Sequence, residues 1–114
     1  MKIDIQTRGF SLTNALLGYS QRRVNGAMAY ISDHVNRVVI RLSDINGPRG
    51  GADKCCHVQV ALAGIPDVVV EDTEVDMYTA IDRAVDRARR TAVRKVDRKQ
   101  TLLKQRETFI FDEE

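Results

Sequence analysis

The segment from residue 76 to residue 99 has the most regular periodicity in the chain and limits what the chain can fold into. Apolar side chains recur there at three- and four-residue spacing, which at 100° per residue gathers them on one stripe of an α-helix. The stripe consists of Tyr78, Ile81, Val85, Ala88, Ala92 and Val96. A helix with such a stripe must bury it against another layer, so the rest of the chain has to supply an apolar surface.

The opposite side of this predicted helix is basic. Five arginines fall within a band of about 80°, directly across from the apolar stripe, and we call them the arginine ridge: Arg83, Arg87, Arg90, Arg94 and Arg98. Several are like-charge neighbours at i, i+4, each pair costing a few tenths of a kcal/mol. Guanidinium groups bind phosphate through two hydrogen bonds. We therefore expect the ridge to bind a polyanion.

A solvated polar face is the alternative interpretation of the same residues. Asp86 can pair with Arg90 at i+4, and Asp97 can pair with Arg94 at i−3. The charge distribution argues against it. Between residues 83 and 99, eight Lys or Arg residues stand against two Asp residues, a net charge of +6 in a chain whose total is +2. The remaining residues therefore sum to −4, and the basic charge is concentrated on one element.

Alternation of apolar and polar residues predicts strands over 2–8, 35–43 and 54–62, and a short apolar run predicts a fourth strand over 67–72. A helix is predicted between the first two strands, from an N-cap at Thr13 to about Ile31. The positions of this helix at helical spacing are Ala15, Leu16, Tyr19, Arg23 and Ala27. The long helix is expected to start after Asp72 or Thr73 and to end near residue 100.

The resulting order β-α-β-β-β-α predicts an α+β fold with two layers. Strands with one apolar face form a sheet covered on one side, so both helices should pack on that face of a four-stranded sheet. With 114 residues the chain can form a single core. We expect one domain over residues 1–103, a glycine-rich loop over 44–53, and a tail over 104–114 that is either loosely docked or disordered.

Arg22 and Arg23 lie near the end of the first predicted helix. If the two helices pack side by side, these residues adjoin the arginine ridge and extend it into a patch. Phosphate contacts of this kind orient a partner without reading its sequence, which favours recognition of folded RNA by shape. An RNA-recognition-motif mode is excluded because the outer face of the middle strands carries no aromatic residue but Arg37, Arg41, His57 and Gln59 instead.

Other functional classes find little support in the sequence. The two histidines, His34 and His57, have no nucleophile at a readable spacing, and the adjacent Cys55 and Cys56 are expected to be reduced and structural. We therefore expect no enzyme activity, no cofactor, no metal site and no small-molecule substrate. The absence of a long apolar run or a secretion signal predicts a cytoplasmic protein without membrane contact. We expect it to be monomeric when free.

Two stretches resemble the ribosome hibernation factors, the family of hibernation promoting factor and ribosome-associated inhibitor A, also called sigma-54 modulation proteins. One is the start of the long helix, with Asp76, Met77, Tyr78, Ala80, Ile81 and Asp82 in place. The other is "IDIQTRGFSLTNAL", with Thr13, Ala15 and Leu16 in place. The resemblance covers residues 1 to about 100 and fits a short form of the family.

This resemblance implies a fold and a function. The family fold is β-α-β-β-β-α, and its members bind the small ribosomal subunit, contact its rRNA and block the mRNA and tRNA channel in stationary phase or stress, which inhibits translation. The RNA-binding residues that the resemblance implies are Arg22, Arg23, Arg83, Arg87, Arg90, Arg94, Lys95 and Arg98. The alternative is a regulatory protein–protein interaction module whose basic helix binds an acidic protein partner.

Overall fold

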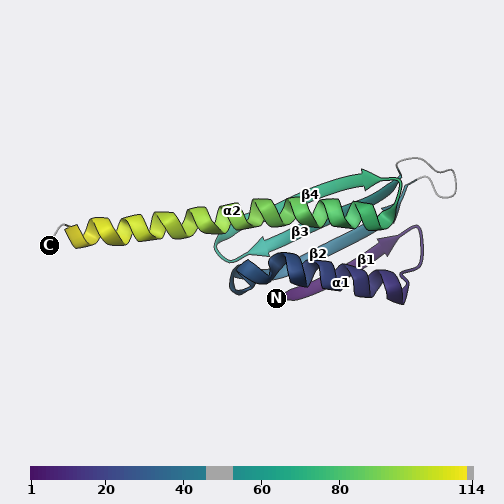
Figure 1. The fold of residues 1–114 in the computed structure, drawn as a ribbon, viewed down its shortest axis with the longest axis horizontal. Helices are drawn as coiled ribbons and strands as arrows, with labels where there is room; N and C mark the ends of the chain where they lie inside the picture. The colour runs from purple at the N-terminus through teal and green to yellow at the C-terminus, as the bar shows by residue number, and fades with distance from the viewer. Residues whose placement is uncertain (46–52, 113–114) are drawn as a thin grey trace.

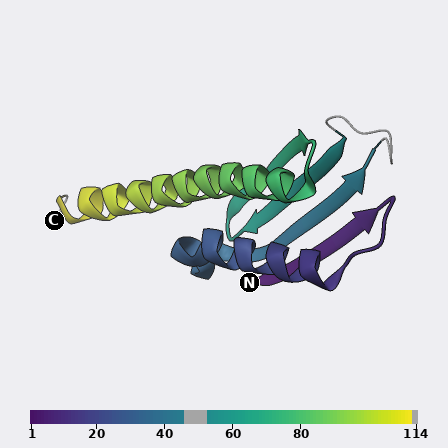
Figure 2. The same cartoon turned by 45° about the vertical axis from the view of Figure 1, so that its right-hand side comes forward.

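The computed structural model describes residues 1–45 and 53–112, with side chains described as far as Lys104 (Figure 1). The elements, in chain order, are β1 (Lys2–Arg8), α1 (Asn14–Met28), a 3-10 helix η1 (Ala29–His34), β2 (Val35–Asp44), β3 (Lys54–Leu62), β4 (Ile65–Glu74) and α2 (Met77–Asp112). The order confirms the predicted α+β fold. Figures 1 and 2 show both helices side by side on one face of the sheet, with the other face uncovered.

The four strands form one mixed sheet in the order β1-β2-β3-β4. β1 runs parallel to β2 because α1 carries the chain back across the sheet, whereas β2, β3 and β4 are antiparallel neighbours. β3 and β4 are joined by a turn at Ala63 and Gly64, and Gly64 has a φ of 68°, in the left-handed region that glycine adopts without strain. Most of the predicted loop over 44–53 lies outside the described residues.

The core lies between the sheet and the two helices. Alternate residues of the central strands point toward the helices and are fully buried, among them Val38, Ile40, Cys56, Val58 and Val60. From α2 the buried residues are Ala80, Ile81, Ala84, Val85, Ala88, Ala92 and Val96. Burying each larger aliphatic side chain contributes about 1.5–3 kcal/mol. Because four of the seven are alanines, the helix backbone can approach the sheet closely.

The predicted apolar stripe of α2 is confirmed with one correction. Tyr78 is 40% exposed and packs its ring against Tyr19 of α1 instead of entering the core. The two ring centroids are 4.8 Å apart in an edge-to-face arrangement. Tyr78 therefore belongs to the contact between the two helices at the start of α2.

The buried face of α1 is rotated from the predicted one. The predicted positions at Ala15, Tyr19 and Arg23 are exposed or half-buried, and the residues that enter the core are Leu16, Ser20, Val24, Ala27 and Met28. Leu16 and Ala27 were predicted correctly. The N-cap at Thr13 is also confirmed, since its hydroxyl accepts a hydrogen bond from the Leu16 amide at 3.1 Å. The α-helix ends at Met28, and the chain continues as the 3-10 helix η1.

Two predicted elements, β4 and α2, have different bounds in the structure. β4 covers residues 65–74 instead of 67–72, because its pairing with β3 continues to the Lys54–Glu74 pair. The longer strand delays α2, which begins at Met77 and not near residue 73. The helix then continues to Asp112, well past the predicted end near residue 100. In the part of the chain that the structure describes, no helix is both long and apolar enough to cross a membrane.

Candidate nucleic-acid interface

The arginine ridge lies on the solvent side of α2. All five of its members are exposed, and the apolar residues on the opposite side of the helix are buried. The helix is anchored to the sheet near the far end of the ridge, where the Lys99 Nζ donates to the Ala63 carbonyl at 3.2 Å. Gln100 lies 3.1 Å from the His34 ring of η1. The five guanidinium groups therefore extend from the part of α2 that is packed against the sheet, between Ala80 and Lys99.

The start of the ridge is tethered to the edge strand β4. The Arg87 guanidinium donates to the Glu71 carbonyl at 3.1 Å, and Arg83 lies 3.8 Å from the Glu74 carboxylate. These contacts hold the two side chains toward the sheet. Because Arg87 contacts a neutral carbonyl group, its positive charge is not cancelled there.

The rest of the ridge contains one ion pair. Arg90 pairs with Asp86 at 2.9 Å, which confirms one of the two pairs that the sequence allowed. The other pair, between Asp97 and Arg94, is not formed, although the structure describes both side chains. Among the side chains described up to Lys104, Arg94 and Arg98 have no carboxylate partner. The end of the ridge is thus the most available part for an external anion.

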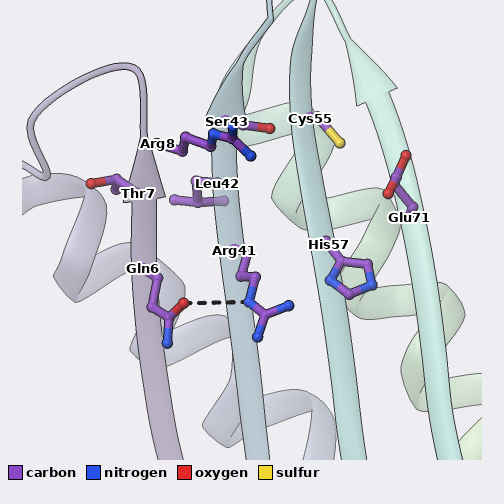
Figure 3. A pocket seen from close by; sticks show the side chains of 9 residues that line it. All are labelled: Gln6, Thr7, Arg8, Arg41, Leu42, Ser43, Cys55, His57 and Glu71. Atoms are coloured by element: carbon purple, nitrogen blue, oxygen red, sulfur yellow. Dashed lines mark hydrogen bonds between the residues drawn. The ribbon is translucent and has the colours of Figure 1, made fainter.

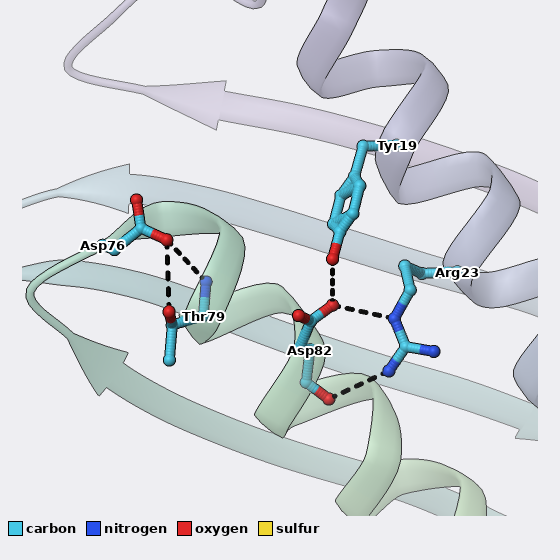
Figure 4. A network of polar contacts seen from close by, with 5 residues as sticks. All are labelled: Tyr19, Arg23, Asp76, Thr79 and Asp82. Carbon is cyan, nitrogen blue, oxygen red and sulfur yellow. Dashed lines mark hydrogen bonds and ion pairs between the residues drawn. The ribbon is translucent and has the colours of Figure 1, made fainter.

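The two arginines of α1 have different surroundings. Arg23 lies between the helices, where its Nε is 2.8 Å from the Asp82 carboxylate and one terminal nitrogen is 3.4 Å from the Asp82 carbonyl (Figure 4). Arg22 is exposed, and one residue of helical rotation turns it to the outer side of α1. Arg23 is therefore part of the packing between α1 and α2, and only Arg22 is free of such a role.

Asp82 also accepts a hydrogen bond from the Tyr19 hydroxyl at 2.5 Å, so one carboxylate joins two side chains of α1 to α2 (Figure 4). This hydrogen bond, together with partial burial and the negative charge of Asp82, raises the pKa of Tyr19 above its usual value. The sequence could not reveal this contact, because Tyr19 and Asp82 are 63 residues apart.

The first turn of α2 is closed by a cap. The Asp76 carboxylate accepts hydrogen bonds from the Thr79 amide at 3.0 Å and from the Thr79 hydroxyl at 3.1 Å (Figure 4). A carboxylate at this position satisfies a free amide of the first turn and faces the positive end of the helix dipole. The cap fixes where α2 begins, and burial of the apolar stripe against the sheet sets which side of the helix the ridge occupies.

Two further basic residues lie beside the ridge. Lys95 is half-buried on the flank of α2. Arg89 is exposed and has no carboxylate partner among the described side chains, but it was not among the predicted site residues. Its helical angle places it about 120° from Arg83, outside the ridge. The only sequence signal for it was the density of arginines in "RARR" at residues 87–90.

The surroundings of the two cysteines are those of structural residues. Both are buried free thiols, and burial raises the pKa of Cys56 to about 12. Within residues 1–45 and 53–112, no group of three or more His, Cys, Asp or Glu residues could hold a metal ion.

The chain is similar to known proteins in both sequence and fold. Residues 3–101 match the family model described as sigma 54 modulation protein / S30EA ribosomal protein. The N-terminal domain of Protein Y from Thermus thermophilus is 29% identical, with a TM-score of 0.68 over 82% of this chain and 98% of that one. A ribosomal subunit interface protein from Coxiella burnetii is 18% identical and has a similar fold, with a TM-score of 0.66 over 88% of this chain and 99% of that one. No curated protein matches.

Proposed function

Because the chain belongs to the sigma 54 modulation protein / S30EA ribosomal protein family, whose members are ribosome-associated, we propose that it binds the small ribosomal subunit and inhibits translation there. In this proposal the arginine ridge contacts rRNA and the domain occupies the mRNA and tRNA channel during stationary phase or stress. Lys95 and Arg22 add contacts at the margins of the ridge. Arg23 takes part through its packing role, because Asp82 neutralises its charge.

The observation that carries the proposal is the charge left unpaired at the end of the ridge. Arg94 and Arg98 are i, i+4 neighbours of like sign on one helix face, and neither has a carboxylate partner among the described side chains. Such a pair costs a few tenths of a kcal/mol in the free protein. Bound phosphates remove this cost and release condensed counterions from the RNA, which favours binding.

Rigidity of the ridge supports the same interpretation. Arg83 and Arg98 are 15 residues apart, about 22 Å along a helix axis. A row of guanidinium groups with fixed spacing fits one shape of folded RNA better than others, although it makes no contact that reads base sequence. The ridge therefore offers affinity and orientation to a partner of defined shape.

The test is sedimentation of the purified protein with ribosomes through a sucrose gradient at moderate salt. The variant Arg94→Glu/Arg98→Glu changes the two ridge residues without described partners, so it should leave the fold intact. The matched control Lys2→Glu/Arg37→Glu makes the same change of charge on the open face of the sheet. We expect the wild type and the control to sediment with the small subunit, and the ridge variant to stay at the top.

Circular dichroism should give the same helix content for all three proteins. Equal loss of binding in both variants would show that net charge, and not the ridge, drives association. Retained binding in the folded ridge variant would exclude the ridge as the contact surface. Failure of the wild type to sediment with ribosomes would favour an acidic protein as the partner of the basic helix.

A further inference from the structure

The open face of the sheet, which both helices leave uncovered, contains a hollow of about 460 Å³ (Figure 3). Strand pairing places Gln6, Arg41, His57 and Glu71 in one row across all four strands. All four side chains line the hollow, and Arg8 and Ser43 of the neighbouring row line it too. A polar hollow on a sheet face is thus built from every strand.

Two arginines give one side of the hollow a positive charge. Arg8 on β1 and Arg41 on β2 are exposed, and they are diagonal neighbours on the pleated surface. Neither has a carboxylate partner in the described part of the chain. The only hydrogen bond of Arg41 there is from its Nε to the Gln6 amide oxygen at 3.3 Å, which leaves its terminal nitrogens available. The two charges repel each other as long as no anion lies between them.

The same pair of strands provides an internal comparison. Arg37 lies four residues before Arg41 on β2, and the Asp4 carboxylate of β1 forms an ion pair with it. The position that Asp4 has relative to Arg37 is occupied for Arg41 by Arg8, a second cation, and the residue directly opposite Arg41 is Gln6, a neutral amide. A glutamate there would have nearly the same shape and would neutralise Arg41. On this face, Arg37 therefore has a carboxylate partner, and Arg41 has none among the described side chains.

We propose that the hollow binds the phosphomonoester group of a small phosphorylated metabolite, such as a sugar phosphate or a nucleotide. Two guanidinium groups match a group that carries a charge of about −1.5 to −2 at neutral pH. The Ser43 hydroxyl and the His57 ring, which line the same hollow, supply further hydrogen-bond donors. The volume exceeds what a phosphate alone fills and lies in the range of small-molecule sites, about 300–1,000 Å³.

The opposite side of the hollow distinguishes this ligand from an RNA strand. Glu71 on β4 presents a carboxylate there, and Asp67 lies on the same strand toward a second hollow that shares Gln6 and Arg41 with the first. A carboxylate accepts hydrogen bonds from ligand hydroxyl groups but repels further phosphates. A single phosphate attached to a polyol satisfies both sides, whereas a run of phosphodiesters does not.

The site lies on the face away from the helices, while the arginine ridge lies on the helical side (Figures 1 and 3). Ligand in the hollow would leave the ridge open, so the two sites can be occupied together. The inference does not depend on ribosome binding, and its test uses no ribosome.

The test is a titration of the ¹⁵N-labelled protein with ribose 5-phosphate, followed by amide NMR, with ribose as the neutral control. We expect ribose 5-phosphate to shift amides of residues 6–8, 41–43 and 55–57, and ribose to shift none of them. The variant Gln6→Glu should weaken binding at least tenfold without removing a cation. Arg41→Gln should do the same, while Arg37→Gln, on the same face but already paired with Asp4, should leave the affinity unchanged.

Three results would overturn the proposal. The first is equal shifts with ribose 5-phosphate and ribose, and the second is phosphate-dependent shifts confined to residues 83–98. The third is binding of a short RNA with a 5′-hydroxyl to these amides when ribose 5-phosphate fails to bind, which would assign the hollow to an RNA backbone. Because Gln6→Glu is expected to strengthen the pairing of the two strands, loss of binding in that variant cannot be attributed to unfolding.

Discussion

Arg23 of α1 and Asp82 of α2 form an ion pair with an Nε–Oδ1 distance of 2.8 Å, and this pair lies on the side of α1 that faces α2. The side chains are 36% and 44% exposed, so solvent screens part of the attraction. Because the Tyr19 hydroxyl binds the same carboxylate oxygen, Asp82 is the residue through which the polar contact between the helices is made.

We expect Asp82→Ala to lower the free energy of unfolding by about 1–2 kcal/mol, because it removes one ion pair and one hydrogen bond at a partly buried seam. The pKa of Tyr19 should fall toward its usual value in this variant, since Asp82 is the main cause of the increase. Urea denaturation measures the first effect, and NMR titration of the tyrosine rings measures the second.

The control for this prediction is Asp86→Ala. It removes the pair with Arg90 on the exposed side of α2, where the two side chains are 65% and 51% exposed. This loss should be below about 0.5 kcal/mol. Equal effects of the two substitutions would contradict a special role for Asp82.

Two glycine-to-alanine substitutions should have opposite effects on stability. Gly26 lies in α1, and an added Cβ would meet no atom within 4 Å, so Gly26→Ala should stabilise the protein by about 0.5–1 kcal/mol. Gly64 has a φ of 68°, and a Cβ there would collide with the Lys99 Nζ. Gly64→Ala should destabilise by about 1–2 kcal/mol. Thermal unfolding of both variants, with a melting temperature that rises for one and falls for the other, is the measurement.

Ionisation of the Cys56 thiol should make the free energy of unfolding depend on pH in the alkaline range. Its pKa is raised from an ordinary value of 9.0 to about 12, because burial disfavours the thiolate. Below pH 9 the thiol keeps its proton in both the folded and the unfolded state, and the buried thiol makes its full contribution to the free energy of unfolding. As the pH rises from 9 toward 12, the unfolded chain loses this proton first, so the free energy of unfolding should fall by up to about 1.4 kcal/mol per pH unit.

The measurement is urea denaturation between about pH 8 and pH 11 under reducing conditions, a range that spans most of the interval between the two pKa values. Cys56→Ala has a lower stability at neutral pH but lacks this ionisation, so its stability should fall less steeply with pH. All other ionisable groups are common to the two proteins, and the comparison cancels their contribution. Parallel pH profiles would contradict the assignment to Cys56.

The salt dependence of ribosome binding should report on the arginine ridge. Each phosphate contact adds close to one unit to the slope of log affinity against log salt concentration. Arg94→Gln/Arg98→Gln should therefore reduce the slope by about two units. Lys2→Gln/Arg37→Gln should leave it unchanged. A slope that is the same in both variants would place the phosphate contacts elsewhere.

The sequence alone correctly predicted the features that depend on the periodicity of a single strand or helix. Alternation placed Val38, Ile40 and Leu42 toward the helices, and the 100° rotation per residue placed Arg90 and Arg94 on the solvent side of α2. These features depend only on neighbours within the same element. The family resemblance read from residues 76–82 is likewise confirmed by the match over residues 3–101.

Contacts between elements could not be predicted in this way. From the sequence, Arg23 could lie in an exposed basic patch or in the contact between the two helices. The ion pair with Asp82, which is 59 residues later in the chain, places it in the contact between the helices. The face of α1 was misassigned for the same reason, because Tyr19 has an apolar ring that can pack against another helix as well as against a sheet. The sequence also did not show that Arg41 lacks a carboxylate partner among the described side chains, because this depends on which residues of β1 lie beside it.

Among the side chains that are described up to Lys104, the last core residue of α2 is Val96, yet the helix continues to Asp112, and Leu102 and Leu103 are exposed. Packing in the core therefore places little constraint on the amino acids at Leu102 and Leu103. Substitutions there can accumulate without affecting folding, and any that are not tolerated would be excluded by a binding partner. Sequence variation along one helix would then separate two kinds of selection. Up to Val96, selection for folding acts on the buried stripe and selection for binding acts on the arginine ridge, whereas at Leu102 and Leu103 selection for binding would act alone.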